Sequence, residues 1–313
     1  MPLNAGLVIP RGSASDLIGR VAQAERRGIA TAWTTVGGLG ADPVTALAAV
    51  GAATDRIRLG TAVTPTYPRH PITLAAQAIA IDDLASGRLR LGVGPSHKPI
   101  IEGAYGLPMG KPLAHLREYV TILRMLLWEG AADFSGDYFT VKIALQAGVL
   151  APKIPIPISA LRPNAFRLAG EIADGAISWV TPVDYLTRTA LPQLQAGAEV
   201  MGRDRPPLIA HVPVIVSTDR VAARAAFRAQ FPHYSRLPFY AAMFAEAGYP
   251  ITAAGEMTDE LVESLAVSGG PEEIRDRLEA IRARGIDELM ISHVVVADEE
   301  AELAALSEIL AGE

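Results

Sequence analysis

Residues 56–99 read RIRLGTAVTPTYPRHPITLAAQAIAIDDLASGRLRLGVGPSHKP, and this stretch decides the fold. Short apolar runs at residues 57–63 and 89–94 predict two strands, and the longer run at 71–85 between them predicts a helix. The helix is apolar nearly all round until Asp82, as expected of a helix that packs against a sheet. Two parallel strands joined by a helix make one βαβ unit.

The rest of the chain repeats this alternation. Further strands are predicted at residues 3–9, 31–35, 156–161, 175–180, 208–216 and 288–292, with helical segments between them. Eight strands alternating with eight helical segments predict an α/β protein with a closed (β/α)8 TIM barrel. A doubly wound open sheet is the alternative. Its GxGxxG fingerprint is incomplete here, because His97 stands where the third glycine would fall.

Two segments fall outside the alternation. Residues 134–139 come after a helix predicted at 115–129, and they predict a small hairpin. Residues 232–255 follow strand seven and are rich in proline and aromatic residues, so we expect them to be irregular and to form an insertion over one end of the barrel. We expect one barrel domain over residues 1–313, because such barrels often run to about 250 residues as one unit.

Composition narrows the class of protein. A net charge of −6 without clustered basic residues argues against nucleic acid as a partner. The chain has no apolar run long enough to span a membrane and no signal peptide at its N-terminus. The absence of cysteine excludes disulfides, a thiolate nucleophile and a Cys-ligated metal. We therefore expect a cytoplasmic protein that acts on a small molecule.

Common catalytic motifs are missing. None of the six histidines forms HxH or HExxH, so no metal site is predicted, although three distant histidines could converge in the fold. There is no GxSxG nucleophile elbow. Asp82 and Asp83 are adjacent on a helix and point apart, which does not suit paired acid–base work.

Two loops that follow predicted strands carry better candidates. Ligands of α/β folds bind beyond the carboxyl ends of the strands. After strand four, Gly94 allows close approach of the backbone, and residues 96–98 (Ser-His-Lys) offer hydrogen-bond donors to an anion. After strand five, Arg162 adds a bidentate donor, and Pro163 starts a helix whose free N–H groups favour a phosphate. The alternative for both loops is an exposed polar surface.

Residues 59–71 and 86–99 resemble the luciferase-like monooxygenase superfamily, and more narrowly its coenzyme F420-dependent oxidoreductases. The similarity extends through residues 115–119, 134–136, 168–175 and 269–273, so it covers nearly the whole chain. It implies a (β/α)8 barrel with an insertion after strand seven, a homodimer, and a bound deazaflavin (F420) or flavin (FMN).

The resemblance also assigns site residues. It implies a non-prolyl cis peptide at Ala62–Val63 that supports the central ring of the cofactor, with Thr61 and Thr64 on either side. The cofactor-tail loop would be formed by Gly94, Pro95, Ser96, His97 and Lys98. The phosphate-contacting loop would be formed by Arg162, Pro163 and Asn164.

The sequence departs from the pattern of the family at two places. Many F420-dependent dehydrogenases have a catalytic histidine at the end of strand two, where residues 33–36 (Trp-Thr-Thr-Val) offer no base for alcohol oxidation. His97 matches a catalytic acidic residue of sugar-phosphate dehydrogenases, so it is the candidate proton donor. Relatives often have glycine where Arg162 stands, and this extra cation either strengthens phosphate binding or blocks it.

We expect hydride transfer from reduced deazaflavin to an electron-poor small molecule, with specificity set by residues 105–112 and 232–255. An FMN-dependent luciferase-like monooxygenase is the first alternative, and a non-catalytic flavin- or deazaflavin-binding barrel is the second. F420 carries an acidic tail, so an open basic groove near Lys98 and Arg162 would favour F420, whereas a closed site would favour FMN.

Overall fold

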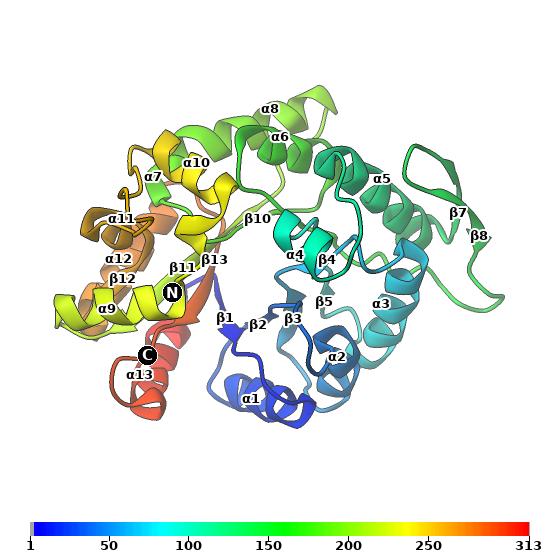
Figure 1. Ribbon diagram of the computed structural model, residues 1–313. Coiled ribbons are helices and arrows are strands. Elements are labelled where there is room, and N and C mark those ends of the chain that lie inside the picture. The colour runs from blue at the N-terminus through cyan, green and yellow to red at the C-terminus, as the bar shows by residue number, and fades with distance from the viewer. Residues whose placement is uncertain (1–2, 313) are drawn as a thin grey trace.

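The computed structural model describes residues 3–312 and contains a closed ring of parallel strands (Figure 1). The expected domain range of 1–313 also includes residues 1, 2 and 313, which lie outside the described residues. The ring strands are β1 (Ala5–Ile9), β2 (Thr31–Thr34), β3 (Arg58–Thr61), β4 (Thr64–Pro65), β5 (Leu89–Arg90), β6 (Val93–Gly94), β9 (Ile158–Ser159), β10 (Ala176–Ser178), β11 (Leu208–Val216) and β13 (Glu288–His293).

Strand pairing closes the sheet into the predicted (β/α)8 barrel. The strand order is β4-β6-β9-β10-β11-β13-β1-β2-β3-β5. Strand three consists of β3 and β4, and strand four consists of β5 and β6. Because β3 pairs with β5 and β4 pairs with β6, the two ends of this order meet. All eight predicted strands are present, and two of them are interrupted.

Both interruptions lie where strands three and four run side by side. The backbone of strand three turns at the cis peptide Ala62–Val63. Opposite this bend, Gly92 lies so close that a Cβ atom on it would be 1.9 Å from the carbonyl oxygen of Thr61. The Gly92 carbonyl accepts hydrogen bonds from the Thr61 hydroxyl (2.7 Å) and the Thr64 N–H (2.8 Å). Only glycine fits at this crossing.

Helices surround the ring, and two of them begin at side chains that cap their first turn. Asp42 caps α2 by accepting from the N–H of Thr45, and Ser13 caps α1. The surrounding helices are α1 (Ala14–Arg26), α2 (Pro43–Ala52), α3 (Pro71–Ala85), α5 (Pro112–Arg124) with the π-helix η1 (Met125–Glu129), α6 (Pro163–Ile172), α7 (Val183–Tyr185) with the π-helix η2 (Leu186–Ala190), α8 (Leu191–Val200), α9 (Arg220–Gln230), α12 (Pro271–Ala283) and α13 (Glu299–Ala311). No helix within residues 3–312 is long and apolar enough to cross a membrane.

The segment after strand seven is more regular than expected. Residues 232–255 contain the 3-10 helix η3 (Tyr234–Arg236) and the helix α10 (Pro238–Ala247). Pro238 occupies the first turn of α10, where proline is tolerated, and Gly248 ends the helix with φ of +94°. The expectation of irregular structure was therefore wrong for α10. Before strand eight the chain also forms α11 (Asp259–Leu265) and β12 (Val267–Gly269), which the sequence did not predict.

The hairpin predicted at residues 134–139 is present as β7 (Ala131–Ser135) and β8 (Thr140–Ala144). Its turn docks on α5, because the Glu118 carboxylate accepts hydrogen bonds from the N–H groups of residues 137–139. Figure 1 shows the hairpin projecting away from the ring of strands.

The interior of the barrel is filled around Trp33. Its indole is fully buried between Gly6 and Gly60. A Cβ atom on Gly6 would be 2.8 Å from the ring, and one on Gly60 would be 2.2 Å from it. The guanidinium of Arg90 lies 4.6 Å from the ring centroid and pairs with Glu288 at 2.7 Å. The small apolar cluster inside the ring consists of Val8, Trp33, Ala62, Ile177, Ile209 and Met290. The barrel is therefore closed by side chains, and a ligand must bind at its carboxyl end.

Candidate cofactor and active site

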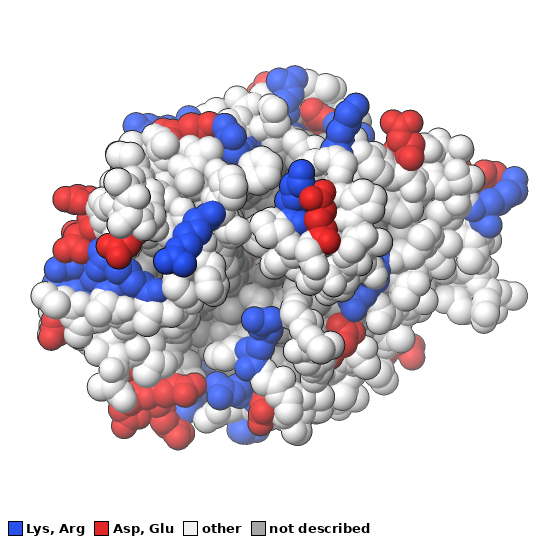
Figure 2. All heavy atoms as spheres, viewed as in Figure 1, with Lys and Arg blue, Asp and Glu red and all other residues white. Residues whose placement is uncertain are grey.

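The carboxyl ends of the strands open into a hollow. The loop after strand four leads into the short helix α4 (Lys98–Gly103), and α10 approaches from the segment after strand seven. Figure 2 shows the surface hollowed between these two helices, with mostly uncharged walls and several Lys and Arg side chains around its rim. The rings of His97 and Tyr240, with centroids 5.9 Å apart, join the two sides. This hollow is the candidate site.

We call the end of strand three at Ala62 and Val63, against which Gly94 of the next loop packs, the floor of the site. The cis peptide at Ala62–Val63 is present, as the resemblance implied. Val63 is half-buried and packs against the apolar cluster inside the barrel. The predicted neighbours Thr61 and Thr64 are fully buried, so their side chains do not face the hollow. The Thr61 hydroxyl donates to the Gly92 carbonyl oxygen, whereas the buried Thr64 hydroxyl has no hydrogen-bond partner within residues 3–312.

The predicted tail loop also follows its strand into the hollow. Gly94 is buried, and a Cβ atom on it would be 2.1 Å from Ser159 Oγ and 2.8 Å from Val63 Cγ2. Glycine is therefore required for packing within the protein, in addition to any approach of a ligand. Ser96 has the left-handed φ of +62°. Lys98 is exposed and lies 3.8 Å from the carboxylate of Glu102 one helical turn later.

His97 lies at the start of α4 with a half-buried ring. Burial lowers the pKa of its imidazole, because the charged form loses hydration. At neutral pH the imidazole is therefore neutral, so one ring nitrogen carries a proton that it can donate and the other nitrogen can accept one. Its place at the rim of the hollow fits the predicted role in proton transfer, which stays a prediction.

The predicted phosphate loop forms the beginning of α6. Arg162 is the N-cap residue and Pro163, which has no N–H, follows in the first turn, while the N–H of Ala165 donates to the Arg162 carbonyl oxygen at 2.9 Å. The N–H of Asn164 is therefore left without an intrahelical partner. No side chain caps this end. The Arg162 guanidinium forms an ion pair with Glu246 of α10. The predicted cation thus meets a carboxylate from a part of the chain 84 residues away.

Sequence reasoning missed three residues beside this floor. Trp179 follows β10, is half-buried and packs on the same interior cluster as Val63. Its indole stacks on the buried imidazole of His211, and His211 Nε2 lies 2.7 Å from Ser292 Oγ. Trp179 lies inside the strand predicted at residues 175–180, so the search for polar or aromatic side chains after a strand passed over it, whereas β10 ends at Ser178.

The tautomer and charge of His211 follow from its surroundings. The N–H of Val180 donates to Nδ1 at 3.2 Å, so the ring carries its proton on Nε2 and donates it to Ser292. Complete burial lowers the pKa of His211 to about 3. The imidazole under Trp179 is therefore neutral at neutral pH.

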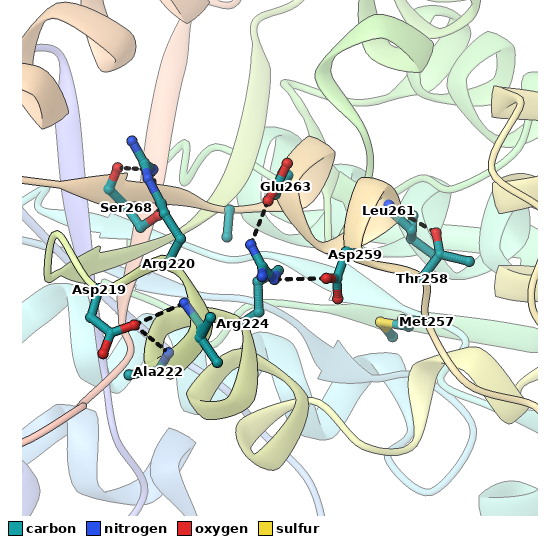
Figure 3. A network of polar contacts seen from close by, with 12 residues as sticks. Asp219, Arg220, Ala222, Arg224, Met257, Thr258, Asp259, Leu261, Glu263 and Ser268 are labelled. Carbon is teal, nitrogen blue, oxygen red and sulfur yellow. Dashed lines mark hydrogen bonds and ion pairs between the residues drawn. The ribbon is translucent and has the colours of Figure 1, made fainter.

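Two cavities lie away from the hollow and include none of the predicted site residues. One of about 550 Å³ is lined by residues of β1, α1 and α13. The other, of about 350 Å³, is lined by residues of α9, α11, β12 and α12. At the second cavity, Arg220 donates to Ser268, and Arg224 pairs with Glu263 at 2.8 Å and with Asp259 at 3.1 Å (Figure 3). The two ion pairs of Arg224 link α9 to α11, and the hydrogen bond of Arg220 links α9 to β12.

A metal site was not predicted. In the part of the chain from 3 to 312, no group of three or more His, Cys, Asp or Glu side chains is arranged to hold a metal ion.

Comparison with known proteins identifies the family. The model of the luciferase-like monooxygenase family matches residues 4–288, so the chain belongs to this family. A provisionally named coenzyme F420-dependent oxidoreductase of Mycobacterium tuberculosis is 30% identical over 328 residues, covering 91% of this chain and 92% of that protein.

Solved structures show the same fold. An F420-dependent secondary alcohol dehydrogenase in complex with an F420-acetone adduct superposes with a TM-score of 0.82 and 18% identity, covering 98% of both chains. The oxygenating constituent of 3,6-diketocamphane monooxygenase from Pseudomonas putida, in complex with FMN, gives a TM-score of 0.75 and 18% identity, covering 100% of this chain and 98% of that chain.

Proposed function

We propose that this protein is an F420-dependent oxidoreductase that transfers hydride from reduced deazaflavin to an electron-poor small organic substrate. One observation carries the proposal: three segments of the predicted cofactor site are linked, because Gly94 packs against Val63 and α10 contacts both His97 and Arg162. Membership of the luciferase-like family and the F420-dependent relative support the same class of cofactor.

The residues present fit such a cofactor. The backbone at Ala62 and the half-buried Val63 would support the ring system, and the apolar cluster beside them would exclude water. The N–H of Asn164 in the first turn of α6 and the Arg162 guanidinium would hold the phosphate, because a free N–H at a helix N-terminus and a cation both favour an anion. When bound, F420 supplies the hydride chemistry, and the protein supplies position and a proton.

Reduction of the substrate is favoured over oxidation of an alcohol. β2 ends at Thr34, and the residues that follow it, Thr35 and Val36, offer no general base. His97 lies within the predicted tail loop, and its neutral ring would donate a proton to the reduced product.

The FMN-dependent monooxygenase stays the second candidate, and α10 is the observation that favours it. The contacts of α10 with His97 and Arg162 narrow the hollow, and both predicted cations, Lys98 and Arg162, are already paired with carboxylates. A narrower and less basic site suits FMN better than the acidic tail of F420. The non-catalytic barrel is the third reading, in which a cofactor binds without turnover.

Anaerobic turnover separates these functions. The protein is mixed with reduced F420 and a panel of electron-poor acceptors, such as enones, quinones and nitroaromatics, and oxidation of F420 is followed by its absorbance. We expect enzyme-dependent oxidation with at least one acceptor. A parallel aerobic assay uses reduced FMN in place of F420, and turnover in that assay alone would overturn the proposal in favour of the monooxygenase. Binding of F420 without turnover of any acceptor would favour the non-catalytic barrel.

A further inference from the structure

Glu246 of α10 places a carboxylate where the proposed function requires the cofactor phosphate. One carboxylate oxygen pairs with the Arg162 guanidinium at the N-cap of α6, and the other accepts from the Tyr185 hydroxyl at 3.2 Å. Burial and the nearby Glu246 carboxylate raise the pKa of Tyr185, so its hydroxyl stays protonated and continues to donate. An anion is therefore already present at this end of α6.

Further contacts hold Glu246 in this position. The backbone oxygen of Ala247, the next residue, accepts a hydrogen bond from Arg188 at 3.3 Å. Nearer the start of α10, the Tyr240 ring lies against His97 of the predicted tail loop. The helix α10 thus contacts both predicted cofactor loops. Its three contacts are Tyr240 with His97, Glu246 with Arg162, and the backbone oxygen of Ala247 with Arg188, and together they hold Glu246 at the proposed phosphate position.

The ion pair is accessible enough to exchange partners. The side chains of Arg162 and Glu246 are 40% and 38% exposed, so water screens their attraction. A phosphate carries at least the single negative charge of a carboxylate and forms bidentate hydrogen bonds with a guanidinium. Arg162 can therefore leave Glu246 for a phosphate at little cost, but Glu246 then remains nearby as an unpaired negative charge.

We propose that Glu246 is an internal competitor of the cofactor phosphate and weakens the preference of this site for phosphorylated over phosphate-free cofactors. The inference rests on the proposed function, because it needs a phosphate at Arg162. The proposal also explains how Arg162, which stands where relatives often have glycine, is paired. Glu246 neutralises the Arg162 guanidinium when no cofactor is bound, and Arg162 exchanges Glu246 for the phosphate when the cofactor binds.

The test compares the wild-type protein with Glu246→Gln. Glutamine keeps the shape and one oxygen acceptor for Tyr185 and removes only the charge. Four ligands are titrated by fluorescence: F420, FMN, the deazaflavin riboside without its phosphate tail, and riboflavin. We expect Glu246→Gln to bind the two phosphorylated ligands on the order of tenfold more tightly, since one like charge at several ångströms is removed. Affinity for the two phosphate-free ligands should stay within about twofold.

Tyr185→Phe is the matched control, because it removes a hydrogen bond to Glu246 and leaves the charge. The affinities of the Tyr185→Phe protein for the four ligands should differ from those of the wild-type protein by no more than about threefold. Glu246→Ala repeats the charge removal, should Glu246→Gln fold poorly. Equal tightening for all four ligands, or no change for F420 and FMN, would overturn the role of Glu246 while leaving the proposed function intact. Failure of the wild-type protein to bind any of the four would instead contradict the proposed function, and the inference would fall with it.

Discussion

The indole of Trp179 lies flat on the imidazole of His211, with ring centroids 3.7 Å apart and ring planes 9° apart. His211 is held from both sides, by the N–H of Val180 and by the hydroxyl of Ser292. Three strands of the barrel therefore fix one aromatic wall beside the proposed ring-binding floor. The position of Trp179 depends on a buried neutral histidine that itself does not face the hollow.

Replacing His211 with phenylalanine should preserve the stacking but leave the N–H of Val180 buried without an acceptor. We expect the free energy of unfolding to fall by about 1–3 kcal/mol, the usual cost of an unsatisfied buried donor. Urea denaturation measures this change. Ser292→Ala removes one of the two hydrogen bonds and should cost less, about 1 kcal/mol. A His211→Phe protein as stable as wild type would show that these hydrogen bonds do not position the ring.

Stability should fall on mild acidification. Burial lowers the pKa of His211 to about 3 and that of His115 to about 4, whereas both bind a proton near pH 6.5 when unfolded. Below pH 6.5 the unfolded state therefore binds more protons than the folded state, and the free energy of unfolding declines. Each histidine contributes a slope of up to about 1.4 kcal/mol per pH unit.

Denaturation between pH 7 and 5 measures this effect, because the carboxylates titrate mostly below that window. His211→Phe should show a shallower slope than wild type, since one of the two buried histidines is gone. A stability that is constant or rises as pH falls through this window would contradict the buried neutral state of both rings.

Gly94→Ala should destabilise the loop after strand four. The added methyl group would lie 2.1 Å from Ser159 Oγ, so we expect a loss of about 1–3 kcal/mol in the free energy of unfolding. Adding Ser159→Gly should restore part of the loss, because the remaining neighbour is Val63 Cγ2 at 2.8 Å. Gly103→Ala is the control, as its Cβ would meet nothing within 4 Å. Equal effects of Gly94→Ala and Gly103→Ala would refute the packing argument.

Glu288→Ala should be strongly destabilising. It leaves the guanidinium of Arg90 without its carboxylate beside the buried ring of Trp33, and the exposed fractions of the paired side chains are only 14% and 6%. Breaking such a pair costs about 3–5 kcal/mol. Asp133→Ala is the matched control, because its ion pair with Lys142 is exposed and should contribute less than about 1 kcal/mol. Thermal or urea denaturation measures the loss of stability in each variant, and equal losses for Glu288→Ala and Asp133→Ala would contradict the importance of the buried ion pair.

The barrel could be predicted because alternating apolar strands and helices are a local property of the sequence. The resemblance implied the cis peptide at which strand three breaks, but the break in strand four could not be predicted, since it lies at the close approach of Gly92 to Thr61 across two strands. In α10, the spacing of Tyr240 and Phe244 did signal a helix, but the prolines on either side were interpreted as irregular structure.

The predicted site loops do follow the carboxyl ends of their strands, because this position is set by the chain order alone. Their partners were not predictable. Arg162 meets Glu246 only when two segments far apart in the chain fold together, and Trp179, His211 and Ser292 come from different strands. The homodimer and the single-domain range stay predictions, which sedimentation and limited proteolysis can test.

Cofactor binding tests the central claim most directly. The purified protein is titrated into F420 and into FMN, and cofactor fluorescence is followed. We predict binding of F420 with a Kd below about 100 μM, or about 5.5 kcal/mol of affinity, and a change of at least severalfold with Arg162→Gly. If neither cofactor binds below about 100 μM, the account of this site is contradicted.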